Sequence, residues 1–358
     1  MKTSRFKLAL VLVTLIALAA PGAAQALPRG FFGIVPQTTL GPEDFSRMRA
    51  GGDETIRVPV SWSATKPKAN SDFEWAGLDA TVASAARERI EVLPFLYSTP
   101  RWLSGDWRRL PVDNARQRRA WGEFVTAIVA RYGRTGTFWA EHGPSSDEPL
   151  PRLPIRNWQI WNEENFFYFT RPASPQRYAR LLAVSRPAIN RGDPRGDLVL
   201  GGLFGEPRQR PPRAMDAVEF LEQLYRVRGV KANFDGVAVH PYAADAAELR
   251  RIVEEVRQVM IRNGDRATGL FLTEVGWGSQ ANSPISFEVG LRGQARELRA
   301  AYRYLIGNRG RLRLRQVDWF TWKDMPGSCN FCDSTGLFRA GAKFRPKPAW
   351  HAFVSFAR

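Results

Sequence analysis

The stretch from Asn157 to Asn165 reads Asn-Trp-Gln-Ile-Trp-Asn-Glu-Glu-Asn, an apolar and aromatic run that ends in a polar cluster. A short apolar run with this ending is typical of a buried strand whose last residues open into a site. A second such stretch, from Phe271 to Trp277, reads Phe-Leu-Thr-Glu-Val-Gly-Trp. The two stretches predict that Glu163 and Glu274 stand at the ends of two buried strands and face each other across a cleft.

Strand-like and helix-like segments alternate from residue 30 to the end of the chain. The opening stretch is the fourth strand, and the other seven are expected at residues 31–35, 54–60, 90–97, 197–204, 234–239, 269–275 and 316–322. The clearest helix ends at Gly133 and carries one apolar stripe at helical spacing from Trp121 to Tyr132. Strict alternation favours a parallel sheet with crossover helices, and eight units predict a closed (β/α)8 TIM barrel.

The first 26 residues have the pattern of a secretory signal peptide. A basic start precedes an apolar stretch, Leu8 to Ala20, and a small-residue cleavage site, Ala24-Gln25-Ala26. Thirteen apolar residues are too few to span a bilayer, and no later stretch is long and apolar enough to do so. We therefore expect a secreted protein whose residues 27–358 form one catalytic barrel domain, without membrane attachment after the signal is removed.

The chain has a formal net charge of +17, or +14 without Lys2, Arg5 and Lys7 of the signal. A basic surface could attract acidic polysaccharides, cell-wall polyanions or nucleic acid. The arginines are scattered along nearly every expected helix, however, which favours a compositional bias. No nucleic-acid-binding motif is present, so we expect no nucleic-acid partner and at most a weak attraction to acidic polysaccharides.

Cys329 and Cys332 are the two cysteines of the chain. In an exported protein, a Cys-x-x-Cys pair favours a small disulfide loop. A zinc site needs about four ligands, which two cysteines and three scattered histidines do not supply in a recognisable pattern. A redox motif would need a βαβ context that the flanking sequence lacks.

Active sites of barrels of this kind lie at the C-terminal ends of the strands. The expected strand ends supply a polar and aromatic set: Arg57, Tyr97, Asn162, Glu163, His240, Tyr242, Glu274 and Trp322. Glycoside hydrolysis needs two carboxyl groups, separated by about 5–5.5 Å in enzymes that retain the anomeric configuration. Arg57 and Tyr242 are plausible donors to Glu274, and Asn162 could hold a sugar 2-hydroxyl.

The motifs resemble those of clan A glycoside hydrolases, the "4/7" barrel superfamily. The run from Trp161 to Asn165 is similar to the Trp-Asn-Glu-Pro-Asn acid/base motif on strand four, and the run from Thr273 to Trp277 is similar to the nucleophile motif on strand seven. Arg57, the His-Pro-Tyr run from His240 to Tyr242, and Trp322 also match. Glu164 replaces the usual Pro; it could raise the pKa of its neighbour or point to solvent.

The resemblance implies a retaining glycosidase that cleaves β-linked glycosides or polysaccharides, with Glu163 as acid/base and Glu274 as nucleophile. Asn162, Arg57, His240, Tyr242 and Trp322 would then be substrate-binding or supporting residues, with no metal and no organic cofactor. His240 could instead be an ordinary buried histidine. A transglycosylase with the same residues and a non-catalytic glycan-binding barrel stay open as alternatives. The sequence leaves the sugar, the linkage and endo or exo action undetermined.

Overall fold

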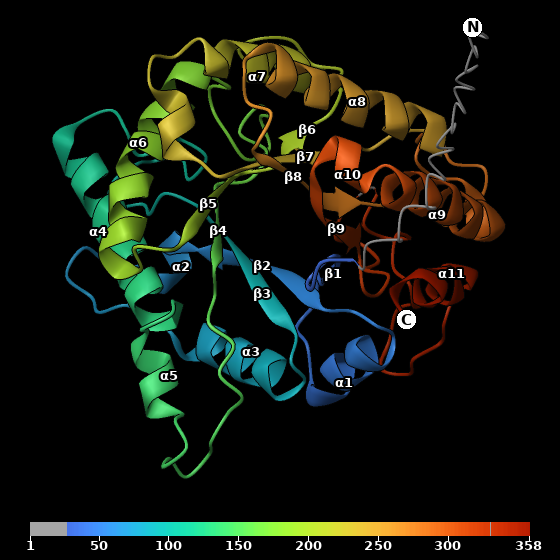
Figure 1. Ribbon diagram of the computed structural model, residues 1–358, viewed down its shortest axis with the longest axis horizontal. Coiled ribbons are helices and arrows are strands. Elements are labelled where there is room, and N and C mark those ends of the chain that lie inside the picture. The colour runs from blue at the N-terminus through green and yellow to red at the C-terminus, as the bar shows by residue number, and fades with distance from the viewer. Residues whose placement is uncertain (1–26, 330) are drawn as a thin grey trace, which may run out of the picture.

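The structure is a computed structural model that describes residues 27–329 and 331–358. The expected signal peptide, residues 1–26, lies outside the described residues. The described chain forms a ring of strands with helices around it (Figure 1). No helix within the described ranges has the length and apolar character needed to cross a membrane.

All the strand pairings of the sheet are parallel, and the sheet closes on itself through a pairing of β5 with β7. The strands are β1 Phe32–Val35, β2 Thr55–Ser61, β3 Glu91–Tyr97, β4 Asn157–Ile160, β5 Asp197–Leu200, β6 Leu203–Phe204, β7 Gly236–His240, β8 Gly269–Val275 and β9 Leu314–Phe320. β5 and β6 together are the fifth strand of the barrel. The predicted (β/α)8 barrel is confirmed.

The helices cover the outside of the barrel (Figure 1). They are α1 Pro42–Ala50, α2 Trp62–Thr65, α3 Ala76–Arg87, α4 Ala115–Tyr132, α5 Thr137–Glu141, α6 Pro175–Gly192, α7 Ala217–Tyr225, α8 Ala246–Arg262, α9 Gly290–Gly307, α10 Arg309–Leu312 and α11 Pro348–Ala357, with a 3-10 turn η1 at Val230–Asn233. The side chain of Asn114 caps α4, and the apolar stripe predicted for this helix is buried. The short helices α2, α5 and α10 were not predicted, since four or five residues are too few to show a helical period.

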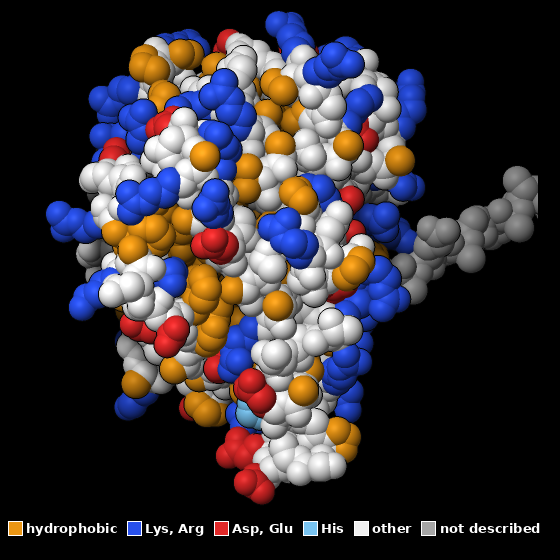
Figure 2. Space-filling model, turned by 90° about the vertical axis from the view of Figure 1, so that its left-hand side faces the viewer, with side chains coloured by type: hydrophobic (Ala, Val, Ile, Leu, Met, Phe, Trp, Pro, Cys, Tyr) orange, Lys and Arg blue, Asp and Glu red, His pale blue; other side chains and the backbone are white. Residues whose placement is uncertain are grey.

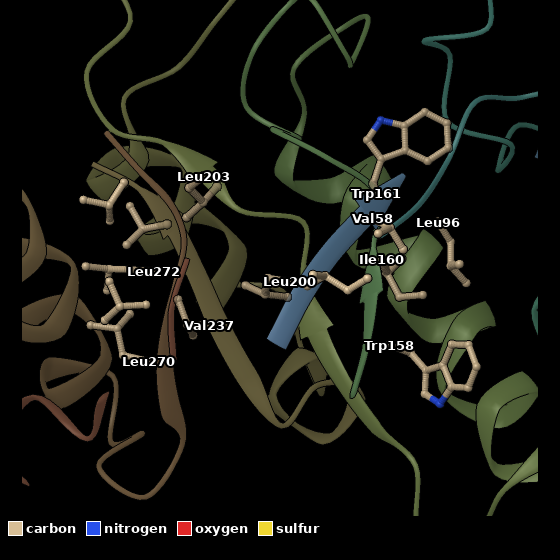
Figure 3. Close-up of a cluster of buried hydrophobic side chains, with 14 of the residues drawn as sticks. Val58, Leu96, Trp158, Ile160, Trp161, Leu200, Leu203, Val237, Leu270 and Leu272 are labelled. Atoms are coloured by element: carbon tan, nitrogen blue, oxygen red, sulfur yellow. The ribbon is translucent and has the colours of Figure 1, made fainter. Parts of the chain in front are cut away.

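Residues of β4 alternate between the outside and the inside of the barrel. Trp158 and Ile160 point outward into the layer between strands and helices (Figure 3). Trp161, just beyond the strand, packs edge-on against Trp121 of α4 at 6.0 Å. Gln159 points inward, where it meets Arg57. The outer face of β4 therefore packs into the main apolar core, and its inner face carries a polar group.

Two glycines interrupt the fifth strand between β5 and β6. A Cβ on Gly201 would lie 2.5 Å from Oε2 of Glu164, and a Cβ on Gly202 would lie 2.2 Å from Nε2 of His240. Gly202 also has a φ of +88°, which favours glycine. The break in the strand therefore makes room for two buried side chains next to Glu163.

Candidate active site

Arg57 of β2 lies fully buried inside the barrel and joins three strands. Its guanidinium donates to Oε1 of Gln159, to Oε1 of Glu274 and to Oδ1 of Asn162, each at 2.6 Å. The same group stacks 4.1 Å from the ring centroid of Phe95 on β3. A planar guanidinium has donors in fixed directions, so these bonds fix the relative positions of the side chains that accept them.

Glu274 stands near the end of β8, where the pairing with β9 shifts register between Leu272 and Val275. This irregularity lets two consecutive residues, Thr273 and Glu274, both turn toward the site. Tyr242 donates to Oε2 of Glu274 at 2.6 Å, while Arg57 holds Oε1. Burial raises the pKa of Glu274, but Arg57 and Tyr242 oppose that rise by stabilising the carboxylate.

Glu163 follows β4 in a left-handed backbone conformation, with a φ of 41°. Such a conformation costs on the order of 1–3 kcal/mol for a residue other than glycine and is common at functional sites. Burial, and after it the charge of Glu274, holds the pKa of Glu163 well above its usual range, although Arg57 opposes this. No arginine or tyrosine within the described chain donates a hydrogen bond to the carboxyl group of Glu163. The environments of the two carboxyl groups therefore favour a proton on Glu163 and a charge on Glu274.

His240 lies at the end of β7 and reaches both carboxyl groups. Its Nδ1 is 3.1 Å from Oε1 of Glu163 and 3.6 Å from Oε2 of Glu274. Burial and then the positive charge of Arg57 hold the pKa of His240 well below its usual range, so the imidazole is neutral and carries a single N–H.

A chain of hydrogen bonds decides which nitrogen of His240 carries that proton. Arg57 can only donate, so the oxygen of Gln159 faces it, and the amide nitrogen of Gln159 donates to Oγ1 of Thr273 at 3.1 Å. The Thr273 hydroxyl, 3.0 Å from Nε2 of His240, can then donate its proton to that nitrogen. This arrangement leaves the proton of His240 on Nδ1, facing Glu163. Gln159 and Thr273 were missed in the sequence, although a Gln within an apolar strand is a signal for an inward-facing polar group.

Glu164 is fully buried, so the interpretation that it points to solvent is wrong. Neither of its oxygens has a hydrogen-bond partner among the described residues. The nearby hydroxyl of Tyr178 is already committed, because it donates to the carbonyl of Ile160 at 2.7 Å and accepts from Gly201 at 2.8 Å. Burial raises the pKa of Glu164 to about 8. When it ionises, its charge raises the pKa of Glu163, as the other interpretation held.

Trp322 does not belong to the site, which corrects the prediction from the sequence. β9 ends at Phe320, and Trp322 lies beyond it with no exposed surface. Its ring packs against Phe338, and its indole N–H donates to Asp44 at 2.8 Å. Phe320 takes the position at the strand end, with its ring centroid 5.9 Å from that of Tyr242.

Cys329 and Cys332 are joined by a disulfide in the structure. The loop that they close carries Phe331, whose ring lies 4.8 Å from that of Tyr242 and stacks on Phe320 at 5.7 Å. The small disulfide loop thus brings an aromatic side chain next to the residue that holds Glu274.

Within the described ranges, Glu163, His240 and Glu274 form a group of possible metal ligands whose donor atoms lie within 4.8 Å of one another. A cation there would meet the charge of Arg57, and both oxygens of Glu274 already accept hydrogen bonds. These contacts favour an uncharged guest between the two carboxyl groups over a metal ion.

The fold and the site define a (β/α)8 barrel with two facing carboxyl groups at the C-terminal ends of its strands. No protein-family model matches the sequence, and no curated protein matches it. Solved structures match over most of the chain. A family 39 glycoside hydrolase from Bacteroides cellulosilyticus WH2 is 19% identical, with a TM-score of 0.62 over 91% of this chain and 63% of that chain.

Two further structures are similar to the same extent. GH5_18 from Bifidobacterium longum subsp. infantis is 16% identical, with a TM-score of 0.65 over 92% of this chain and 78% of that chain. A monomeric β-xylosidase from Caulobacter crescentus CB15 is 17% identical, with a TM-score of 0.61 over 92% of this chain and 68% of that chain. At these identities the likeness establishes the fold alone, a (β/α)8 barrel, as the alternation of strands and helices in the sequence predicted.

Proposed function

We propose that the protein is a glycosidase that cleaves β-linked glycosides with retention of the anomeric configuration. The observation that carries the proposal is the pair Glu163 and Glu274, which have carboxyl oxygens within 4.8 Å of each other and unlike surroundings. Inverting enzymes place their carboxyl groups about 6.5–9.5 Å apart, to leave room for a water, so the short separation supports retention.

In the first step, the carboxylate of Glu274 attacks the anomeric carbon. The bond from that carbon to the leaving oxygen breaks, and the oxygen takes the proton of Glu163. In the second step, Glu163 as carboxylate removes a proton from water, the water oxygen bonds to the anomeric carbon, and the bond to Glu274 breaks. Proton transfer by a positioned group contributes about 10²–10⁴-fold to the rate.

The surrounding residues serve this cycle in different ways. Arg57 and Tyr242 hold Glu274 ionised and oriented for attack. His240 contacts Glu163 through a neutral ring and so orients the acid without adding a charge. The oxygen of Asn162 accepts from Arg57, and its amide nitrogen donates no hydrogen bond to any of the described residues, so this nitrogen can bind a sugar hydroxyl.

The proposal is tested by the configuration of the first product. Proton NMR of an aryl β-glycoside digest should show the β-anomer first, with the α-anomer appearing only by mutarotation. The α-anomer as first product would contradict retention. Adding an acceptor alcohol separates hydrolysis from the transglycosylase alternative, since a transglycosylase gives mainly the acceptor glycoside. Complete activity in Glu274→Ala would favour a site elsewhere.

The protein is also proposed to be secreted, on the pattern of its first 26 residues. Expression of the full chain in a bacterium with a secretory pathway tests this proposal. The exported protein should begin at Leu27, as read by N-terminal sequencing, and an intact Met1 end would contradict it.

A further inference from the structure

The described residues include two large apolar side chains with substantial exposure, Trp107 at 38% and Tyr168 at 60%. Trp107 is on the loop after β3. Tyr168 is on the loop after β4, which also carries Glu163. A contiguous exposed apolar patch often marks a binding surface, whereas a single exposed side chain is ordinary. The rings around these two side chains therefore decide whether they belong to such a patch. β3 and β4 are paired neighbours in the barrel, and the backbone N–H of Phe166 donates to the carbonyl of Glu163 at 2.8 Å. Both loops therefore begin next to the strand end that carries Glu163.

Aromatic rings connect these two side chains to the catalytic centre. Phe204 lies 5.9 Å from Tyr242, Phe166 stacks on Phe204 at 4.6 Å, and Tyr168 lies 5.0 Å from Phe166. The cluster of Phe166, Phe167 and Ala214, with Phe204 packed against it, is separate from the main core. The rings therefore form a wall that leads from the nucleophile's partner to the exposed surface.

A second arm of rings is formed by residues of β3 and of the loops after β3 and β4. The rings of Tyr97 and Trp107 are 6.0 Å apart, and Phe169 lies 6.1 Å from Trp107 and 6.2 Å from Tyr97. The loops that carry the two arms are tied together, since the backbone N–H of Arg171 donates to the carbonyl of Arg108 at 3.1 Å. The exposed aromatic surface is thus built from loops that hold each other in place.

Arginines flank this surface without carboxylate partners. The guanidinium of Arg213 lies 4.4 Å, and that of Arg171 5.9 Å, from the ring centroid of Phe167. Neither forms an ion pair within 4.0 Å in the described part of the chain, and both are exposed. They leave an excess of positive charge beside the aromatic wall.

Three carboxylates near this surface already have hydrogen-bond or ion-pair partners. Asp106 pairs with Arg108 at 2.8 Å, and Glu206 pairs with Arg251 at 2.8 Å. Asp216 accepts from the backbone at the start of α7. The charge of Asp106 acts on Arg171 as well as on Arg108, so Arg171 is partly neutralised, whereas Arg213 forms no ion pair with any of these carboxylates.

We propose that this surface is a subsite for the leaving group of the substrate, and that it takes an acidic sugar such as a uronic acid. The inference rests on the proposed function, because Glu163 protonates the leaving oxygen and the leaving group must therefore lie on its side. Trp107 and Tyr168 offer faces on which sugar rings stack. Arg171 and Arg213 offer the planar donors that bind a carboxylate in a bidentate way.

A general excess of basic residues on the surface and a specific subsite predict different effects of removing single arginines. Lys and Arg side chains are spread over most of the face displayed in Figure 2, apart from its lower end. A bias of this kind attracts any anion and should depend little on which arginine is removed. A subsite should depend on Arg171 and Arg213 and not on a distant arginine. Arg228, exposed just after the C-terminal end of α7 and so at the opposite end of the barrel, serves as the matched control.

The experiment compares two β-linked disaccharides that differ only at C6 of the leaving-group sugar, which is a carboxylate in one and a hydroxymethyl group in the other. We expect wild type to have a kcat/KM at least about tenfold higher for the acidic disaccharide, since one charge-assisted contact is worth on the order of that factor. The ratio should fall several-fold in Arg213→Gln and in Arg171→Gln. It should be unchanged in Arg228→Gln. Trp107→Ala and Tyr168→Ala should lower kcat/KM for both disaccharides.

Equal kcat/KM for the two disaccharides in wild type, or equal effects of the Arg213→Gln and Arg228→Gln variants, would overturn the subsite. Calorimetric binding of the same disaccharides to full-length Glu274→Ala protein gives a readout that does not need turnover. If aryl β-glycosides are not cleaved, the proposed function fails. Preferred binding of the acidic disaccharide, lost in the Arg213→Gln background, would in that case still support an acidic-sugar site.

Discussion

Glu164→Gln should change how the stability of the protein depends on pH. The folded protein holds the carboxyl group of Glu164 in a fully buried position without a hydrogen-bond partner, and burial raises its pKa to about 8. In the unfolded chain the same group titrates near 4.3. Between these two values the unfolded state loses the proton while the folded state keeps it, so stability falls as pH rises.

The size of the effect follows from the two pKa values. Each unit of difference corresponds to about 1.4 kcal/mol, so Glu164 removes on the order of 5 kcal/mol of stability between about pH 4 and pH 8. Glutamine has the shape of the protonated carboxyl group and does not titrate. Urea unfolding of wild type and Glu164→Gln at pH 5.5, 6.5 and 7.5 should therefore show a difference that grows by about 1.4 kcal/mol per pH unit in favour of the variant.

The exposed Glu123 on α4 provides the control for removing one negative charge. Glu123→Gln should differ from wild type by less than about 0.5 kcal/mol. A difference between Glu164→Gln and wild type that stays constant across the pH range, or that shrinks with rising pH, would refute the reasoning about the buried carboxyl group.

Three further predictions concern Tyr242 and Glu163 in the site, and Trp322 outside it. Tyr242→Phe removes the 2.6 Å donor to Glu274, so the pKa of Glu274 should rise and the acidic limb of the kcat/KM profile should move to higher pH. The value of kcat should fall about 10–100-fold, the worth of one hydrogen bond to a charged group; an unmoved acidic limb would contradict the assigned role. Glu163→Gln removes the proton donor and should abolish the basic limb of the pH profile. The value of kcat/KM should fall about 10²–10⁴-fold for substrates with poor leaving groups and much less for dinitrophenyl glycosides. Equal losses for both kinds of substrate would argue against an acid role. Trp322→Phe removes the hydrogen bond to Asp44 and should lower the free energy of unfolding by about 1–3 kcal/mol with KM unchanged; a raised KM with unchanged stability would return this residue to the site.

Much of the site could be predicted because polar residues at strand ends stand out against the apolar runs before them. Arg57, Asn162, Glu163, His240, Tyr242 and Glu274 were predicted on this ground, and the structure brings all six together. The inward position of Gln159 was not predicted, although the period of a strand could have indicated it. The shift of register in β8 has no such signal, because a bulge depends on how two distant strands pair.

The error at Trp322 has a physical cause. The apolar run at 316–322 continues past the end of β9 because Trp322 packs against Phe338 and Trp350, next to the C-terminal helix α11. A run of apolar residues indicates that the chain is buried, and this chain stays buried beyond the end of the strand. The burial of Glu164 could not be predicted either, because it depends on the space that Gly201 leaves on a neighbouring strand.

The most direct test of the account is to trap the covalent intermediate. A 2-deoxy-2-fluoro β-glycoside with a good leaving group should inactivate the enzyme, because fluorine at C2 slows the second step more than the first. Digestion and mass spectrometry should then locate the fluorosugar on the peptide that contains Glu274, and Glu274→Ala should not be labelled. Label on Glu163, on Glu164 or on any other residue would contradict the assignment of Glu274 as the nucleophile.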